Sequence, residues 1–305
     1  MKLNHLLHTF RSSRAALLAA IALAGIGTAN AANFFDNTIS GINLGNASGG
    51  TTGGHRNWAI FALSGGVAIS NTSLDAPYEV LGNVGMAGAG SLTMTLTEIK
   101  GTVYKSTGSY NGGGTITGGT PITDTSYVTT AASNATAASN TATSLATYTA
   151  GLGVSGSVTS AMLTTGASIL LNGVSGGITD KGVAGTYVLN LTNLSLSGIG
   201  AILTLTGTSS TNYVINVAAS LALTGTGSQI VLSGGLTPQN VLFNVKNNVT
   251  TPAVTLSGGA TLNGIILATN RAVNLNGASK VFGEVIGNSV SLSGSSHVYN
   301  PLVSP

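Results

Sequence analysis

The sequence predicts a mainly β protein, a β-solenoid of irregular coils with one long α-helix packed alongside. Two features lead to this fold class. A five-residue motif of an apolar residue, a variable residue, Leu, Ser/Thr/Asn and Gly recurs seven times after residue 193. One Ala-rich stretch without Gly or Pro, residues 124–150, has instead the periodicity of a helix.

The N-terminus has the pattern of an export signal. Three basic residues precede an apolar run at 15–27, and Ala-Asn-Ala at 29–31 supplies the small residues of a cleavage site. The apolar run is shorter than the ~20 residues of a membrane-spanning helix. We therefore predict a cleaved signal peptide over 1–31, an extracellular or cell-surface location, and no transmembrane segment in the mature chain.

The charge balance argues against a nucleic-acid partner. The sequence has ten Lys and Arg and seven Asp and Glu, and three of the basic residues lie in the leader, so seven of each remain. The remaining basic residues are scattered singly: Arg56, Lys100, Lys105, Lys181, Lys246, Arg271 and Lys280. A nucleic-acid partner would need clustered Lys and Arg. Cysteine is absent, so sheet hydrogen bonds and packing must hold the exported chain together.

Strands are expected before the helix. Residues 32–57 are rich in Gly, Asn and Thr and are interpreted as an irregular lead-in. The strands expected after it are 58–63, which contains the single Trp, 67–70, 78–86, 91–99 and 101–104. The segment 91–99 alternates cleanly, with Leu92, Met94 and Leu96 on one face.

The stretch 124–150 predicts a helix that docks on a sheet. Its apolar residues recur at steps of three or four: Tyr127, Ala131, Ala135, Ala138, Ala142 and Leu145. Asp124 is a candidate N-cap and Gly151 a candidate stop. Because Ser and Thr make a weak isolated helix, docking must stabilise it. The alternative is a disordered Ser/Thr/Ala linker.

The seven motifs predict stacked coils. They begin at residues 194, 203, 221, 230, 254, 273 and 290, and the last three starts are 19 and 17 residues apart. A repeat of this length that opens with a short strand and a glycine corner is typical of a solenoid. In each coil we expect Val and Leu to point inward, Gly to take the corner, and the alternate residue to point outward.

The outward positions form the candidate site. They are Ser195, Thr204, Ala222, Val231, Thr255, Asn274 and Ser291, with the polar residue before each Gly beside them. The predicted binding surface consists of Thr204, Thr206, Thr224, Ser233, Thr255, Ser257, Asn274, Asn276, Ser291 and Ser293. Stacked coils would place equivalent residues ~4.8 Å apart in a regular ladder. The alternative is that Ser and Thr merely suit a soluble strand surface.

Several stretches match one known family. They are WAIFAL (58–63), GNVGM (82–86), the Ala-rich helix, GTYVLNLTNLSLSG (185–198), YVINV (213–217), LTPQNVLFNV (236–245) and the tail 262–300. The tail is the most specific, with Leu-Asn-Gly, a Leu-Ala strand, Gly-Glu-Val-Ile-Gly and Leu-Ser-Gly before a final His-Val. Over 58–298 the chain resembles the choice-of-anchor A family, the ice-binding-like adhesive domain of bacterial surface proteins.

The resemblance implies a right-handed, roughly triangular β-solenoid with the helix 124–150 alongside. It implies a single domain over 58–300, followed by a short tail at 301–305. Family members usually end in a sorting or anchoring tail, and 301–305 carries no such motif.

Motifs of catalysis are weak in this sequence. GVSGG at 173–177 fits the Gly-x-Ser-x-Gly pattern, but a nucleophile needs a strand–turn–helix setting with a His and an acid. GLGVSG at 151–156 fits Gly-x-Gly-x-x-Gly, but it follows a helix, and we expect a helix stop and a turn there. We therefore expect no enzyme and no cofactor.

Metal ligands are also sparse, and no metal is expected. Asp75 and Glu79 are interpreted as a solvated loop pair rather than a calcium site. His297 is interpreted as a polar cap on the exposed end of the solenoid. Trp58 and Phe61 are expected in the core.

Three functions remain for the outward ladder. We favour a non-enzymatic extracellular or cell-surface protein whose ladder attaches to a glycan, matrix protein or mineral, or to further copies of the chain in a matrix. The first alternative is ice binding, in which a flat hydroxyl ladder orders water; the mixture of Ser, Thr, Asn, Ala and Val favours adhesion instead. The second is a β-helix enzyme acting on polysaccharide, which is disfavoured because Glu284 is the only acid after Asp180.

Overall fold

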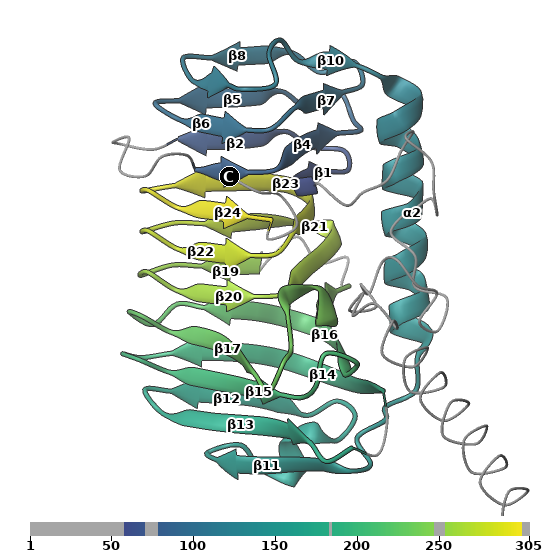
Figure 1. Ribbon diagram of the computed structural model, residues 1–305, viewed down its shortest axis with the longest axis vertical. Helices are drawn as coiled ribbons and strands as arrows, with labels where there is room; N and C mark the ends of the chain where they lie inside the picture. Colours follow the sequence, from purple (N-terminus) through teal and green to yellow (C-terminus); the bar gives the residue numbers. More distant parts are fainter. Residues whose placement is uncertain (1–57, 71–78, 183–184, 247–253, 301–305) are drawn as a thin grey trace, which may run out of the picture. The chain divides into compact units, whose positions relative to one another are not determined.

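The computed structural model describes residues 58–70, 79–182, 185–246 and 254–300, all of which belong to one compact unit. The predicted signal peptide, lead-in and tail lie outside these residues. The described chain is a β-solenoid with one long helix along its side (Figure 1). This confirms the predicted fold class, and every strand pair is parallel except the one between β11 and β13.

The strands form a sheet of fourteen and a sheet of ten. The larger sheet divides into two faces, because its four longest strands run across a corner: β14 (Thr186–Ser197), β16 (Asn212–Leu223), β21 (Ile265–Leu275) and β23 (Val285–Ser293).

The helix face contains the first parts of these long strands and five shorter ones: β1 (Trp58–Ala62), β4 (Asn83–Met86), β7 (Val103–Lys105), β10 (Ile122–Thr123) and β18 (Val241–Val245). The open face contains the second parts of the long strands with β2 (Val67–Ser70), β5 (Leu92–Thr95), β8 (Tyr110–Gly112), β12 (Ser168–Asn172) and β19 (Val254–Leu256).

The third face is the ten-stranded sheet. Its strands are β3 (Val80–Leu81), β6 (Glu98–Lys100), β9 (Thr115–Ile116), β11 (Leu152–Gly156), β13 (Ser175–Asp180), β15 (Ile202–Thr206), β17 (Gln229–Ser233), β20 (Thr261–Asn263), β22 (Lys280–Phe282) and β24 (His297–Tyr299). Two short 3-10 helices, Ser160–Leu163 and Pro238–Asn240, complete the described elements.

The two ends of the described chain meet in the middle of the stack. The C-terminal coil pairs with the N-terminal strands, β23 with β1 and β2, and β24 with β3. The N-terminal strands build away from this seam, and α2 (Thr125–Ser144) then carries the chain along the stack to the far end, where β11 begins (Figure 1). The last coil in sequence is therefore not the last in space.

This order corrects the interpretation of His297. Its strand β24 has β22 on one side and β3 on the other, and the side chain is buried. It is an interior residue of the stack and not a cap on an end, because the N-terminal strands cover the coil that contains it.

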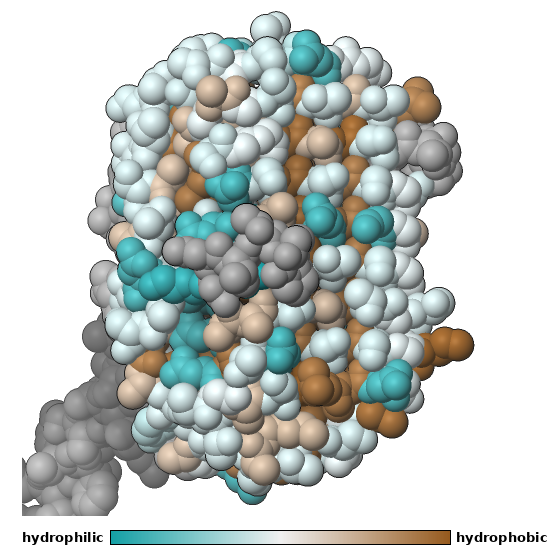
Figure 2. All heavy atoms as spheres, turned by 180° about the vertical axis from the view of Figure 1, so that it is seen from behind, coloured by the Kyte–Doolittle hydropathy of each residue, from teal (hydrophilic) through white to brown (hydrophobic). Residues whose placement is uncertain are grey.

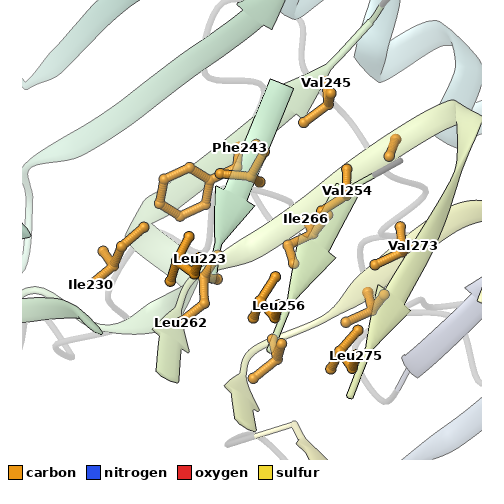
Figure 3. Close-up of a cluster of buried hydrophobic side chains, with 14 of the residues drawn as sticks. Leu223, Ile230, Phe243, Val245, Val254, Leu256, Leu262, Ile266, Val273 and Leu275 are labelled. Atoms are coloured by element: carbon orange, nitrogen blue, oxygen red, sulfur yellow. The ribbon is translucent and has the colours of Figure 1, made fainter. Parts of the chain in front are cut away.

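The core lies inside the coils. The apolar residues at the first and third positions of the motifs are buried as predicted, with Leu256 and Leu275 at 0% and 1% exposure, except Leu232, which is only partly buried. Figure 3 shows side chains from neighbouring coils converging on this interior, among them Phe243 and Leu262. The predicted glycine corner also holds: Gly198 has φ +74, and a Cβ on Gly225 would lie 1.7 Å from the Gly198 carbonyl oxygen.

Helix α2 confirms the predicted start and stripe but is shorter than expected. The Asp124 side chain accepts a hydrogen bond from the Tyr127 amide at 3.0 Å. The helix ends at Ser144 and not at Gly151, because the chain turns extended at Leu145 and Tyr148 bridges to Val188 of β14.

A second apolar cluster joins this helix to the helix face. Its buried members are Val128, Ala131, Ala135, Ala138 and Ala142 of the helix, and Trp58, Phe61, Val188, Val214, Leu242, Ile265, Leu267 and Ile286 of the strands. Small Ala side chains let the helix approach the sheet closely. Trp58 and Phe61 are thus buried as expected, between sheet and helix.

A row of three Asn fixes the C-terminal half of the helix. Asn190, Asn216 and Asn244 are in register on β14, β16 and β18. The Asn244 amide donates to Asn216 and the Asn216 amide donates to Asn190, both at 2.7 Å. Asn216 also donates to the Ala142 carbonyl of the helix at 2.7 Å, and Asn190 donates to the carbonyl of Leu145, the residue after the helix, at 3.0 Å. The row therefore satisfies carbonyl groups that the end of a helix leaves without partners.

Three predicted segments differ in detail. The strand expected over 78–86 is broken at Gly82, where φ is +125, and the strand over 91–99 is broken at Leu96, where φ is +50. Both breaks are solenoid corners, and Leu96 is half-exposed rather than buried. The segment 151–156 forms strand β11 and not only a turn, since it pairs antiparallel with β13.

Candidate functional site

The open face carries a ladder of small uncharged side chains. One outward residue of each coil is in direct register with the next, and the row continues across the seam: Leu170, Ser195, Ala222, Thr255, Asn274, Ser291, Ala68, Thr93 and Asn111. Leu170 is the one large apolar member, with 59% exposure. The inter-strand distance sets the repeat at ~4.8 Å.

A second row runs beside the first. Strand pairing and backbone hydrogen bonds continue it through Asn172, Ser197, Thr224, Ser257, Asn276, Ser293, Ser70 and Thr95. Figure 2 views the molecule from behind and shows pale columns along the long axis, with narrow brown lines of apolar atoms between them. Together these two rows are called the open-face ladder below.

The structure separates the predicted site residues into two groups. Seven lie in the open-face ladder: Thr224, Thr255, Ser257, Asn274, Asn276, Ser291 and Ser293. The other three, Thr204, Thr206 and Ser233, lie on β15 and β17 of the third face, where Thr204 is in register with Val231. The expectation of one ladder is corrected, because some coils contain the motif twice, once on each face.

The N-terminal strands contribute five residues to the open-face ladder, and none of these five was among the predicted site residues. They are Ala68, Ser70, Thr93, Thr95 and Asn111. The sequence carried a signal for them, since large apolar residues alternate with small or polar ones over 67–70 and 92–95, and the structure buries the apolar ones. The missing information was that these strands continue the face of the C-terminal coils.

The other two faces are less suited to a flat contact. Helix α2 covers the helix face. The third face bears charged residues in register, such as Lys280 beside Thr261, and bulky ones, such as Phe282 and Tyr299 with ring centroids 5.4 Å apart. Among the described residues, the open-face ladder therefore combines exposure, regularity and lack of charge.

The catalytic motif does not form a site in the described part of the chain. Ser175 lies on the third face in the same row as His297, but Ile202, Gln229, Thr261 and Lys280 separate them. Five inter-strand steps correspond to ~24 Å. This distance is far beyond the hydrogen-bond reach of a nucleophile and its base.

Acidic side chains give no metal centre within the residues that the structure covers, where no group of three or more potential ligands gathers. Asp75 lies outside the described residues. Glu79 is 1% exposed, and its carboxylate accepts a hydrogen bond from the Glu98 amide, so it is buried rather than part of a solvated loop pair. In the same part of the chain, no helix has the length and apolar character needed to cross a bilayer.

The fold is similar to those of known ice-binding proteins. A glycosylated ice-binding protein from an Arctic yeast has 20% identity and a TM-score of 0.52, with 82% of this chain and 93% of that chain covered. An ice-binding protein from the Antarctic ascomycete Antarctomyces psychrotrophicus has 20% identity and a TM-score of 0.51, with 82% and 96% covered. At these identities the likeness concerns the fold.

A bacterial structure is similar to the same extent. An ice-binding protein domain from Shewanella frigidimarina has 13% identity and a TM-score of 0.50, with 82% of this chain and 95% of that chain covered. No curated protein matches the sequence. The family model of the ice-binding-like adhesive domain matches residues 27–298, which is most of the chain. The chain therefore belongs to the family of ice-binding-like adhesive domains.

Proposed function

We propose that this protein is a non-enzymatic, exported binding protein that attaches to an extended solid surface through the open-face ladder, and that ice is this surface. The observation that carries the proposal is the unbroken register of small uncharged side chains across coils from both ends of the chain. The family and the structural neighbours support it. The predicted signal peptide over 1–31 would deliver the protein to the outside of the cell.

Rigidity and repetition would give the open-face ladder its affinity for a surface. Each rung offers only a weak contact, such as one hydroxyl or one methyl group. Many weak contacts give useful affinity when a stiff scaffold presents them together, because little ordering entropy is then lost on binding. A parallel solenoid is such a scaffold, and its ~4.8 Å repeat is comparable to the oxygen repeat of ice planes.

The lack of charge on the ladder favours ice. A charged side chain holds its hydration water strongly, and removing that water is costly. Hydroxyl, amide and methyl groups can join an ordered water layer without this cost. The open-face ladder contains no charged side chain, whereas the described part of the third face has several, among them Lys100 and Lys280.

The second candidate is adhesion to a glycan, matrix protein, mineral or a second copy of the chain. The mixed composition of the ladder favours it, since Leu170, Ala222, Thr255 and Asn274 occupy equivalent rungs. A uniform lattice would be matched best by one repeated residue, whereas an irregular partner tolerates variation. The two candidates share the same face and differ in what it touches.

The test is a matched pair of triple variants. Thr255, Asn274 and Ser291 are each changed to Lys on the open face, and Thr204, Gln229 and Thr261 are each changed to Lys on the third face. All six side chains are partly exposed, so both variants should keep melting temperatures close to that of the wild type.

Ice shaping, freezing-point depression beyond the osmotic effect, and attachment of protein-coated beads to solid surfaces are then measured. We expect the open-face variant to lose binding and the third-face variant to keep it. If the wild type shapes ice and the open-face variant does not, ice is the surface. If beads coated with the wild type attach to solid surfaces but the wild type has no ice activity, the function is adhesion. Equal binding by the two variants would place the contact elsewhere.

A further inference from the structure

A cavity of about 390 Å³ lies beside the last turn of α2, where β14 and β16 cross the corner between two faces and where β18 ends. Its lining includes Thr143 of the helix, Thr165, and Thr192, Ala218 and Lys246 on the strand side. None of these belongs to the open-face ladder. The volume falls within the range of ~300–1,000 Å³ that is typical of small-molecule sites.

Two threonine hydroxyls in this cavity donate their hydrogens to the protein. Thr143 donates to the Ser139 carbonyl and Thr192 donates to the Gly166 carbonyl, both at 2.7 Å. A hydroxyl that has donated its hydrogen keeps two lone pairs for accepting hydrogen bonds. Thr143 uses one of them to accept from the Asn244 amide. These oxygens therefore favour a ligand rich in hydroxyl donors.

The amide groups around the cavity are occupied in the same way. Asn216 donates to the Ala142 carbonyl and to Asn190, and Asn244 donates to Asn216 and to Thr143 at 3.0 Å. These bonds hold the floor of the cavity rigid. They leave its recognition chemistry to the threonine oxygens and to Lys246.

Lys246 supplies the charge. Of the described residues that line the cavity, it alone is charged, and it is half-buried. A partly desolvated ammonium group is stabilised by an anion, and a charged hydrogen bond to a carboxylate is stronger than one between neutral groups. The carbonyl oxygens of Ala142 and Leu145, at the negative end of the helix, already accept hydrogen bonds from Asn216 and Asn190.

We propose that this cavity binds a uronic acid unit of an acidic polysaccharide. Lys246 would bind the carboxylate, the threonine oxygens would accept from ring hydroxyls, and the ring C–H groups would contact Ala218, which is exposed. The site is independent of the open-face ladder, and it would let the protein hold an acidic glycan while that ladder contacts a solid surface.

The test measures binding of sodium glucuronate, with glucose and sodium acetate as comparison ligands, by titration calorimetry and NMR on the purified protein. The variant Lys246→Met removes the charge and keeps an unbranched apolar stem. Its matched control is Lys280→Met, at an exposed lysine of the third face. We expect Lys246→Met to bind glucuronate about tenfold more weakly, and Lys280→Met to bind it like the wild type.

A second variant addresses the hydroxyl contacts. Thr192→Val removes one acceptor oxygen at nearly constant volume, and we expect it to weaken both glucuronate and glucose severalfold. The open-face triple Lys variant should bind glucuronate normally, which separates this site from the proposed function. The proposal is overturned if glucuronate binds Lys246→Met as tightly as wild type, if acetate binds as tightly as glucuronate, or if glucuronate does not bind.

Discussion

Asn300 and Trp58 lie 242 residues apart in the chain, yet the Asn300 amide donates a hydrogen bond to the Trp58 carbonyl oxygen at 2.6 Å. In the two neighbouring coils the chain itself passes from the third face to the helix face at this corner, through Gly264 and Gly283. Here β24 ends and β1 begins, and the side chain of Asn300 bridges the two ends. The same amide lies 3.4 Å from the buried carboxyl group of Glu284.

Asn300→Ala should therefore weaken the seam. The substitution leaves the Trp58 carbonyl and the Glu284 carboxyl group without this donor, and an unsatisfied buried polar group costs about 1–3 kcal/mol. Urea denaturation should show the loss as a lower midpoint. The control Asn274→Ala, at a partly exposed open-face position, should change the midpoint little. Equal midpoints for the two variants would show that the bridge does not stabilise the seam.

Glu284 should make stability depend on pH. Burial raises its pKa well above the ordinary value of 4.5, while the hydrogen bond from Asn300 lowers it. Since the folded state holds the proton more tightly than the unfolded state, this contribution is complete below pH 4.5 and is lost as pH rises toward the folded pKa. We expect the free energy of unfolding to fall with rising pH over this window.

The matched variant is Glu284→Gln, which keeps the shape and cannot ionise. Its stability should depend less on pH over the same window in denaturant titrations at several pH values. An unchanged pH slope in Glu284→Gln would contradict the assignment.

Asp180 acts in the opposite direction. Burial raises its pKa, but hydrogen bonds from Thr211, Tyr187 and Gly182 outweigh this effect and lower the pKa below 3.8. Its contribution is lost only as pH falls below that value.

Ala138→Leu should loosen the helix. Ala138 is 1% exposed in the cluster that joins α2 to the sheet, and the extra atoms would overpack it at a cost of about 1–3 kcal/mol. Ala137→Leu is the control, because the neighbouring side chain is exposed. Thermal melting and the rate of proteolysis between Tyr127 and Tyr148 would compare them. Rapid cleavage of the wild type in this segment would argue instead for a loosely held linker.

Leu256→Asp and Leu275→Asp should each destabilise the core by more than about 4 kcal/mol, because an unpaired charge would enter a fully buried position. Thr255→Ser, at the adjacent outward position, should be nearly neutral. Circular dichroism melts of the three variants test the inward and outward assignment directly. It fails if the two Asp variants melt at the wild-type temperature.

Alternation of residue types was enough to predict much of the fold. It identified Leu256 and Leu275 as buried, and the Ala steps identified the docked side of α2. It did not assign each motif to a face, although the motifs at 203 and 230 each begin nine residues after the previous one, at 194 and 221. This half-coil spacing placed them on the third face, while 194 and 221 share the open face.

The seam could not have been predicted from local patterns. Parallel strands pair through backbone groups, which are the same for almost every residue type, so the sequence does not show which strands pair. Strand β1 pairs with β23, more than 200 residues later in the chain. Corners such as Leu96 were missed because a non-glycine residue at φ +50 gives little sequence signal. For the candidate site, residue types were predicted well, whereas the contribution of the N-terminal strands required the topology.

Because the open-face ladder is continuous across the seam, residues on both sides of the seam should contact the same surface. Ser291 of the C-terminal coil is in register with Ala68, which is in register with Thr93. If a flat surface contacts the whole ladder, one long charged side chain on either side of the seam should hold the surface away from neighbouring rungs. Ala68→Lys should therefore reduce ice or bead binding as much as Asn274→Lys does. Thr115→Lys, an exposed third-face change in the same N-terminal strands, should leave binding intact. Normal binding by Ala68→Lys together with a loss in Asn274→Lys would confine the contact to the C-terminal coils.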